Sequence, residues 1–277
     1  MMFKMSKIAR KLMTGTNLQQ QIRKISGYVA VDNGTLFYER HGLGSEAVLC
    51  IPGALGSTQS DFSYQLSEMS KDFTMVSFDP RGYGKSKKVF RDLSKNFYED
   101  DAKDAVKVME KLGFEKYSIL GWSDGGMVGM IVAAMAPHVV NNLVVWGSNA
   151  FLTEKDKALG VSMRDLNKWS ERMRKPMEDI YGKEGLEKLW HGWCDGYSAI
   201  DDVCCDSLPK IKCPTFILHG MKDPMLDSCH YKYLHENIKG SELYIFENGK
   251  HNIHMRYHAE FNELVTDFIR KNNTSKL

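Results

Sequence analysis

The stretch YSILGWSDGGMVGMIVAAMAP, residues 117–137, contains a short apolar run, a glycine-rich turn and a longer apolar run. The first run has the length of a buried strand, and the second is apolar almost all round, as expected of a helix buried against a sheet. Between them, residues 121–125, GWSDG, match the pattern G-x-S-x-G. On a sharp strand-to-helix turn, this pattern projects a serine hydroxyl from the carboxyl edge of a sheet. The stretch therefore predicts an α/β fold and marks Ser123 as a candidate nucleophile.

The same alternation of strand and helix patterns extends along the chain. The first two strands are predicted in GYVAVDNGTLFYERHG, residues 27–42, joined at Asn33-Gly34, which is a strong hairpin signal. Six further apolar runs each end in Gly, Pro, Asn or Asp. Between them lie helical patterns such as residues 97–113, with Gly113 as a stop. The pattern predicts a mainly parallel eight-stranded sheet with helices on both faces.

One segment, residues 151–206, breaks the alternation. It has the pattern of several helices with no convincing strand, and it is rich in charge. Its tryptophans are Trp169, Trp190 and Trp193. An insertion of this length between two core strands can form a lid over a site at their carboxyl ends. We therefore expect a core of residues 27–150 and 207–277 and a helical lid of residues 151–206.

The composition of the 277-residue chain is that of a globular protein, with 43% hydrophobic and 26% charged residues. A formal net charge of +2, with basic residues spread among almost as many acidic ones, argues against a nucleic-acid partner. The six cysteines show neither zinc-binding spacing nor the density of a small secreted scaffold, so we expect reduced thiols in an intracellular protein. No apolar run approaches the roughly 20 residues that span a bilayer. We expect no membrane span.

Both ends of the chain carry sequence patterns of targeting signals. Residues 1–31 contain no acidic side chain. Drawn as a helix, residues 1–13 place apolar and basic side chains on opposite sides. These are the physical features of a mitochondrial presequence, so residues 1–26 are predicted to be a targeting segment, with a disordered basic tail as the other interpretation. Residues 275–277, SKL, match the peroxisomal import tripeptide and give a peroxisomal alternative.

Ser123 needs a base, and the base needs a residue that fixes its tautomer. Asp223 directly follows the apolar run TFILHG, and His251 follows the next run and a glycine turn. The order Ser123, Asp223, His251 is the one that α/β-hydrolases use. Asp227 is a rival acid, although it lies farther from the strand end. The histidines that compete with His251 are His235, His254 and His258.

An oxyanion hole needs two N–H donors, one of them from the residue after the nucleophile. That residue is Asp124. The second donor is expected from residues 51–57, IPGALGS, where Gly53 permits a close approach and Ala54 or Leu55 offers its amide.

No metal or cofactor site is expected. Residues 79–86, DPRGYGKS, lack the spacing of a phosphate-binding loop, so Arg81 is interpreted as structural. His254 and His258 have i,i+4 spacing, but no carboxylate or cysteine is spaced to join them as a ligand.

Several stretches in the core and in the lid together resemble the biphenyl hydrolase-like, or valacyclovir hydrolase, family of α/β-hydrolases. They are PGALGS, DPRGYGKS, DAKDAVKVMEKLGF, LGWSDGG, WGSNA, RDLNKWSERMRKP, HGMKDP and GKHNIHMR. The resemblance implies an α/β-hydrolase fold and a mitochondrial serine hydrolase that acts on esters and prefers α-amino acid esters. It places the family's nucleophile, acid and base on Ser123, Asp223 and His251. Pro52-Gly53 replaces the common HG oxyanion motif, and the terminal SKL is not a family feature.

The sequence thus predicts a cofactor-free carboxylic ester hydrolase that forms an acyl-enzyme, acts on a small-molecule ester and is a monomer. The side chain of Asp124 is predicted to bind an α-ammonium on the acyl group, with a structural hydrogen-bond network as the alternative. A thioesterase or a carbon–carbon bond hydrolase would use the same triad. From another class, a catalytically silent binding module is the remaining alternative.

Overall fold

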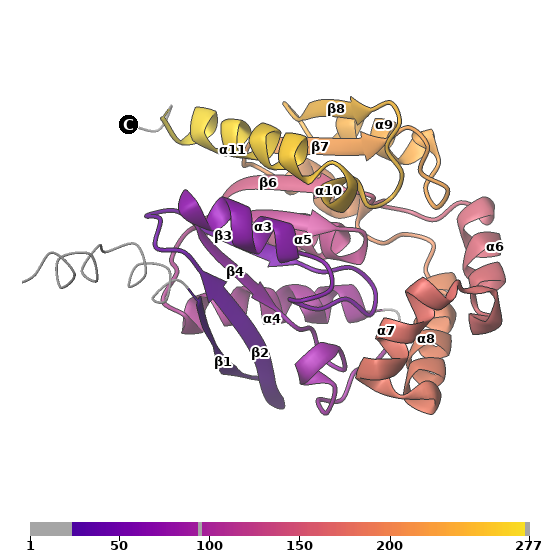
Figure 1. Cartoon of the computed structure of the whole chain (residues 1–277). Coiled ribbons are helices and arrows are strands. Elements are labelled where there is room, and N and C mark those ends of the chain that lie inside the picture. The colour runs from indigo at the N-terminus through magenta and orange to yellow at the C-terminus, as the bar shows by residue number, and fades with distance from the viewer. Residues whose placement is uncertain (1–23, 94–95, 275–277) are drawn as a thin grey trace, which may run out of the picture.

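The computed structural model describes residues 24–93 and 96–274, and both predicted targeting signals lie outside these ranges except for residues 24–26. An eight-stranded sheet crosses the molecule in the order β1-β2-β4-β3-β5-β6-β7-β8 (Figure 1). The pairs β1–β2 and β2–β4 are antiparallel, and all others are parallel. The prediction of a mainly parallel eight-stranded sheet is confirmed.

The strands are β1 (Lys24–Val31), β2 (Gly34–His41), β3 (Ala47–Ile51), β4 (Thr74–Phe78), β5 (Tyr117–Trp122), β6 (Val140–Trp146), β7 (Thr215–Gly220) and β8 (Glu242–Phe246). Short 3₁₀ helices are η1 (Met69–Lys71), η2 (Gly84–Ser86), η3 (Leu166–Lys168) and η4 (Cys205–Lys210).

The first hairpin differs from its prediction in two details. Val31 pairs with Gly34, so the turn is Asp32-Asn33, one residue earlier than the predicted Asn33-Gly34. Asn33 has φ 61°, a left-handed conformation that asparagine adopts more readily than most residues. In addition, β1 begins at Lys24, three residues before the predicted start of the core.

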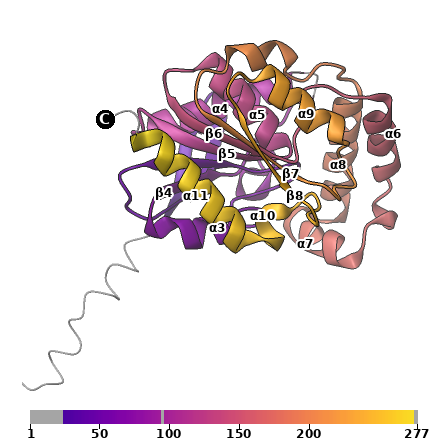
Figure 2. The same ribbon diagram turned by 90° about the horizontal axis from the view of Figure 1, so that it is seen from above.

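Helices cover both faces of the sheet. On one face lie α3 (Ser63–Glu68), α10 (Ile253–Arg256) and α11 (His258–Thr274), and on the other α4 (Phe97–Lys111), α5 (Asp124–Met135) and α9 (Ser228–Asn237) (Figure 2). A separate apolar core fills each of the two layers. Gly113, with φ 81°, follows the end of α4 as the predicted stop. The predicted burial of α5 is also confirmed, since all but two of its residues are buried.

Three α-helices lie between β6 and β7, namely α6 (Glu154–Met163), α7 (Glu171–Tyr181) and α8 (Lys183–Ser198), and we call them the lid. They lie beyond the ends toward which the parallel strands run (Figure 1). The lid has an aromatic core, in which the rings of Trp190 and Trp193 stack at 4.9 Å and Trp169 packs edge-on against Trp190. Among the helices of the described ranges, none combines the length and the hydropathy that crossing a bilayer requires.

Candidate active site

Ser123 lies on a strained turn between β5 and α5. Its backbone has φ 55° and ψ −122°, a conformation that a non-glycine residue rarely adopts and that costs about 1–3 kcal/mol. Two glycines make the turn sterically possible: a Cβ on Gly121 would lie 2.4 Å from the carbonyl oxygen of Gly125, and one on Gly125 would lie 1.9 Å from that of Ile51. The GWSDG pattern therefore forms the strand-turn-helix geometry that its sequence predicts.

Hydrogen bonds from β6 and the residues after it hold this turn. The N–H of Ser123 donates to the carbonyl oxygen of Trp146 at 3.0 Å. The hydroxyl of Ser148 donates to the carbonyl oxygen of Ser123 at 2.8 Å. A Cβ on Gly126 would lie 1.9 Å from the hydroxyl oxygen of Ser148, so a glycine is required there for this contact. These contacts thus stabilise the strained backbone conformation of Ser123.

Asp223 and His251 meet at the ends of β7 and β8. The Nδ1 atom of His251 lies 2.8 Å from Oδ2 of Asp223, while the other carboxylate oxygen accepts the N–H of Met225 at 2.8 Å. Burial raises the pKa of Asp223, but the hydrogen bond and charge of His251 outweigh burial and leave the pKa below its ordinary value. Asp223 is therefore an ionised partner that fixes the imidazole of His251.

A small cavity lies between the lid and the candidate nucleophile and base. It has a volume of about 30 Å³, and Ser123, Asp124 and His251 line it together with Trp193 and other lid residues. Such a volume holds about one or two water molecules. The structure thus brings Ser123 and His251 to one small cavity at the carboxyl edge of the sheet.

The rival acid, Asp227, does not reach His251. Its carboxylate accepts the N–H of Cys229 at 3.4 Å, which caps the start of α9, and pairs with Lys155 at 2.9 Å on the surface. These contacts are those of a structural side chain.

The rival histidines have structural partners. His254 is buried, with Nδ1 accepting from Nε1 of Trp146 at 2.9 Å and Nε2 donating to the carbonyl oxygen of Asp61 at 3.0 Å, and burial lowers its pKa to about 3. His258 lies 3.0 Å from Glu68. His235 lies 2.9 Å from the hydroxyl of Ser241. Within the described ranges, no three His, Cys, Asp or Glu side chains are placed to hold a metal ion.

Arg81, which was interpreted as structural, forms an ion pair with Asp104 on α4. Its guanidinium also donates to the carbonyl oxygen of Asp32 at 2.6 Å. Arg81 therefore ties the loop after β4 to α4 and to the first hairpin.

The loop after β3 contains a tight turn beside Ser123. The N–H of Gly56 donates to the carbonyl oxygen of Gly53 at 3.0 Å, and a Cβ on Gly53 would lie 3.2 Å from that of Ser123. Leu55 has φ 58°, which costs about 1–2 kcal/mol for a residue with a side chain. The N–H of Gly53 is already bonded, to Oδ2 of Asp61 at 3.0 Å. Ala54 and Leu55 therefore remain the two predicted donors of this turn, which we call the oxyanion turn.

The side chain of Asp124 is buried beside the cavity. Its Oδ2 accepts from Nε1 of Trp193 at 2.6 Å, and its Oδ1 accepts from the hydroxyl of Tyr98 at 3.2 Å. Burial raises the pKa of Asp124 to about 6, opposed by the Trp193 hydrogen bond and by the positive charge of Arg91. A carboxylate offers about four acceptor positions, so two neutral donors leave it able to accept from a ligand.

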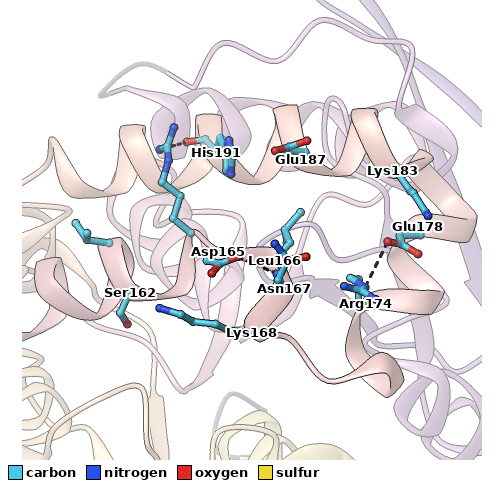
Figure 3. Close-up of a pocket in the computed structure, with 12 residues that line it drawn as sticks. Ser162, Asp165, Leu166, Asn167, Lys168, Arg174, Glu178, Lys183, Glu187 and His191 are labelled. Atoms are coloured by element: carbon cyan, nitrogen blue, oxygen red, sulfur yellow. Dashed lines mark hydrogen bonds and ion pairs between the residues drawn. The ribbon is translucent and has the colours of Figure 1, made fainter.

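A much larger hollow, of about 780 Å³, lies among the lid helices (Figure 3). Charged side chains surround it, with an ion pair of 3.4 Å between Arg174 and Glu178, and neither Ser123 nor His251 lines it. Its own serine, Ser162, donates to the carbonyl oxygen of Leu159 at 2.8 Å and is not paired with a base. Of these two cavities, only the smaller one is lined by the candidate nucleophile and base.

Comparisons with known proteins support the fold and show the family. Residues 46–175 match the family model described as alpha/beta hydrolase fold. Over 251 residues, the chain is 45% identical to the serine hydrolase BPHL of Mus musculus and 44% identical to the serine hydrolase BPHL of Homo sapiens. Each of these two alignments covers 88% of this chain and 86% of the relative. A crystal structure of the enol-lactonase from Burkholderia xenovorans LB400 superposes with a TM-score of 0.70 at 22% identity, over 88% of this chain and 100% of that one, which shows the fold alone. The fold and the relatives support a hydrolase activity, and the chain belongs to the α/β-hydrolase family that includes the serine hydrolase BPHL proteins.

Proposed function

We propose that the protein hydrolyses small-molecule carboxylic esters through Ser123, His251 and Asp223, with a preference for acyl groups that carry an α-ammonium. One observation carries the proposal: the buried carboxylate of Asp124 lines the same cavity as the candidate nucleophile and base. The BPHL relatives are named serine hydrolases, and this supports the proposed hydrolysis through Ser123.

In the acylation step, Nε2 of His251 takes the proton of the Ser123 hydroxyl while the oxygen attacks the ester carbonyl. Asp223 keeps the Nδ1–H tautomer and stabilises the imidazolium that forms. The tetrahedral intermediate collapses when His251 gives the proton to the leaving alcohol, and an acyl-enzyme remains. Water then repeats the same steps and releases the acid.

Negative charge develops on the carbonyl oxygen in both steps. The N–H of Asp124 and one amide of the oxyanion turn are the proposed donors, because they flank Ser123 from α5 and from the loop after β3.

The carboxylate of Asp124 costs the free protein stability at neutral pH. Its folded pKa, about 6, lies above the ordinary value, so its contribution is favourable in acid and is lost as the pH rises through about 6. No lysine or arginine is among the described residues that line the cavity, and the buried Arg91, which acts on Asp124 from outside it, is paired with Asp101, so compensation of the Asp124 charge is incomplete. A substrate ammonium would supply that compensation through a charge-assisted hydrogen bond.

Asp124→Asn tests this role with little change of shape. Nε1 of Trp193 only donates, so the new amide must turn its oxygen to Trp193 and its NH₂ to the hydroxyl of Tyr98, which can accept. We expect kcat/KM for an α-aminoacyl ester to fall about 100-fold, while the same ester without the amino group changes less than about threefold. Steady-state kinetics on the matched ester pair measure both values.

Asp124→Ala is the companion variant, because it removes the carboxylate and its hydrogen bonds together. We expect its kcat/KM to fall more for the α-aminoacyl ester than for the ester without the amino group, as in Asp124→Asn. We also expect a lower melting temperature. Equal losses on both esters in Asp124→Asn and Asp124→Ala would show that Asp124 has a structural role only.

The preference for aminoacyl esters is also expected to depend on pH. Only the ionised carboxylate attracts the ammonium, and burial raises the pKa of Asp124 to about 6. The ratio of kcat/KM between the two esters should therefore fall from about pH 7 to about pH 5, because kcat/KM reports the free enzyme and the free substrate, and the α-ammonium is largely protonated throughout this range. A pH effect that is common to both esters cancels in the ratio. In Asp124→Asn the ratio should be flat, and a flat ratio in the wild type would contradict the prediction.

A further inference from the structure

The hydroxyl of Tyr181 joins the lid to two loops of the core. Tyr181 is the last residue of α7, and its hydroxyl donates to the carbonyl oxygen of Leu55 at 2.9 Å. The same hydroxyl oxygen accepts the N–H of Gly84 at 2.9 Å. These partners are 126 and 97 residues away in sequence. One phenol group thus contacts the oxyanion turn and the loop after β4 at once.

The bond to Leu55 acts on the strained residue of the oxyanion turn. Leu55 has φ 58°, a left-handed conformation that is unfavourable for a residue with a side chain. Its peptide groups would therefore tend to rotate toward a more favourable φ if no contact held them. Asp61 holds the turn at its beginning, through the N–H of Gly53. Tyr181 holds its other end, at the carbonyl group of Leu55. The amides of Ala54 and Leu55 lie between these two fixed points.

A second clamp ties the same core loops together without the lid. The carboxylate of Asp79 accepts the N–H of Thr58 and that of Lys85, both at 2.7 Å. Loss of the Tyr181 hydroxyl therefore leaves the loops connected, and it removes the two hydrogen bonds of the lid to Leu55 and Gly84. The ring of Tyr181 itself packs against the apolar core.

We propose that Tyr181 is a positioning residue that keeps the oxyanion turn in its reactive conformation, so that the oxyanion hole is complete only when α7 is seated on the core. The inference rests on the ester hydrolysis proposed above. It couples closure of the lid to stabilisation of the transition state, because α7 packs on α8, and α8 supplies Trp193 and Tyr197 to the cavity.

Tyr181→Phe keeps the ring and removes the hydroxyl. We expect kcat for an acyl ester to fall about tenfold, because a displaced oxyanion donor weakens transition-state binding. KM should stay within about twofold, because the hydroxyl does not line the substrate cavity. A trifluoromethyl ketone, which forms a tetrahedral oxyanion adduct with a serine, should be bound about tenfold more weakly, whereas the affinity for the product acid should not change.

Tyr244→Phe is the matched control. It also removes one hydroxyl hydrogen bond, the 2.8 Å contact with Glu260 on α11, and should keep the wild-type kcat. Wild-type kcat and ketone affinity in Tyr181→Phe, or an equal loss of ketone and product affinity, would overturn the role of Tyr181 alone. If the ketone does not inhibit the wild type and Ser123→Ala keeps full activity, the ester mechanism is wrong, and so is this inference.

Discussion

Ser123→Ala is expected to lower kcat for ester hydrolysis by about 10⁴- to 10⁶-fold, the largest loss of any single substitution in this chain. The substitution removes the atom that forms the acyl-enzyme, and His251 then has no hydroxyl to deprotonate. The turn should keep its shape, since its glycines and its backbone hydrogen bonds to Trp146 and Ser148 do not depend on the hydroxyl. Kinetics with a simple acyl ester and a thermal melt measure the two effects.

Two comparisons make this result specific. Ser162→Ala alters the serine of the large lid hollow and should leave kcat unchanged, because Ser162 lies outside the small cavity. A fluorophosphonate should label the wild type and Ser162→Ala, but not Ser123→Ala. Retained hydrolysis in Ser123→Ala would refute the acyl-enzyme mechanism and revive the interpretation of a silent binding module.

The sequence predicts those parts of the molecule that depend on local patterns. The eight strands, the helix ending before Gly113 and the turn at Ser123 each follow from periodicity and turn residues within a short window. Asp223 and His251 were also predicted locally, because each follows the end of a strand and parallel strands end at the same edge of the sheet. Their contact at 2.8 Å is a consequence of that shared edge.

The contacts that shape the site could not be predicted in this way. Trp193 was predicted only as part of an aromatic lid, yet it bonds Asp124 across 69 residues of sequence. Tyr181 meets Leu55 across 126 residues, and no local pattern marks either partner. Such contacts depend on how the lid packs on the core, which residue periodicity does not specify. They are also the contacts on which substrate preference and the oxyanion turn are proposed to depend.

Asp223→Asn should lower kcat by about 10⁴-fold, the second largest expected loss, although it changes only one atom of the side chain. The N–H of Met225 needs an acceptor, so the amide oxygen of the new residue must stay where Oδ1 of Asp223 lies now. The NH₂ group then faces Nδ1 of His251 and donates to it. His251 must carry its proton on Nε2, and that atom can no longer accept the proton of Ser123.

Asp227→Asn is the control that separates the two candidate acids. Asp227 pairs with Lys155 on the surface, where an ion pair contributes at most about 1 kcal/mol, so the variant should keep its kcat and nearly all its stability. Both variants carry the same chemical change four positions apart in one loop, and only Asp223 contacts the imidazole. A greater loss of kcat in Asp227→Asn than in Asp223→Asn would mean that the loop rearranges during catalysis and that the acid has been assigned to the wrong residue. We expect kcat of Asp227→Asn to exceed kcat of Asp223→Asn by about 10⁴-fold. Because both variants should keep the fold, this ratio tests the triad through the tautomer of His251.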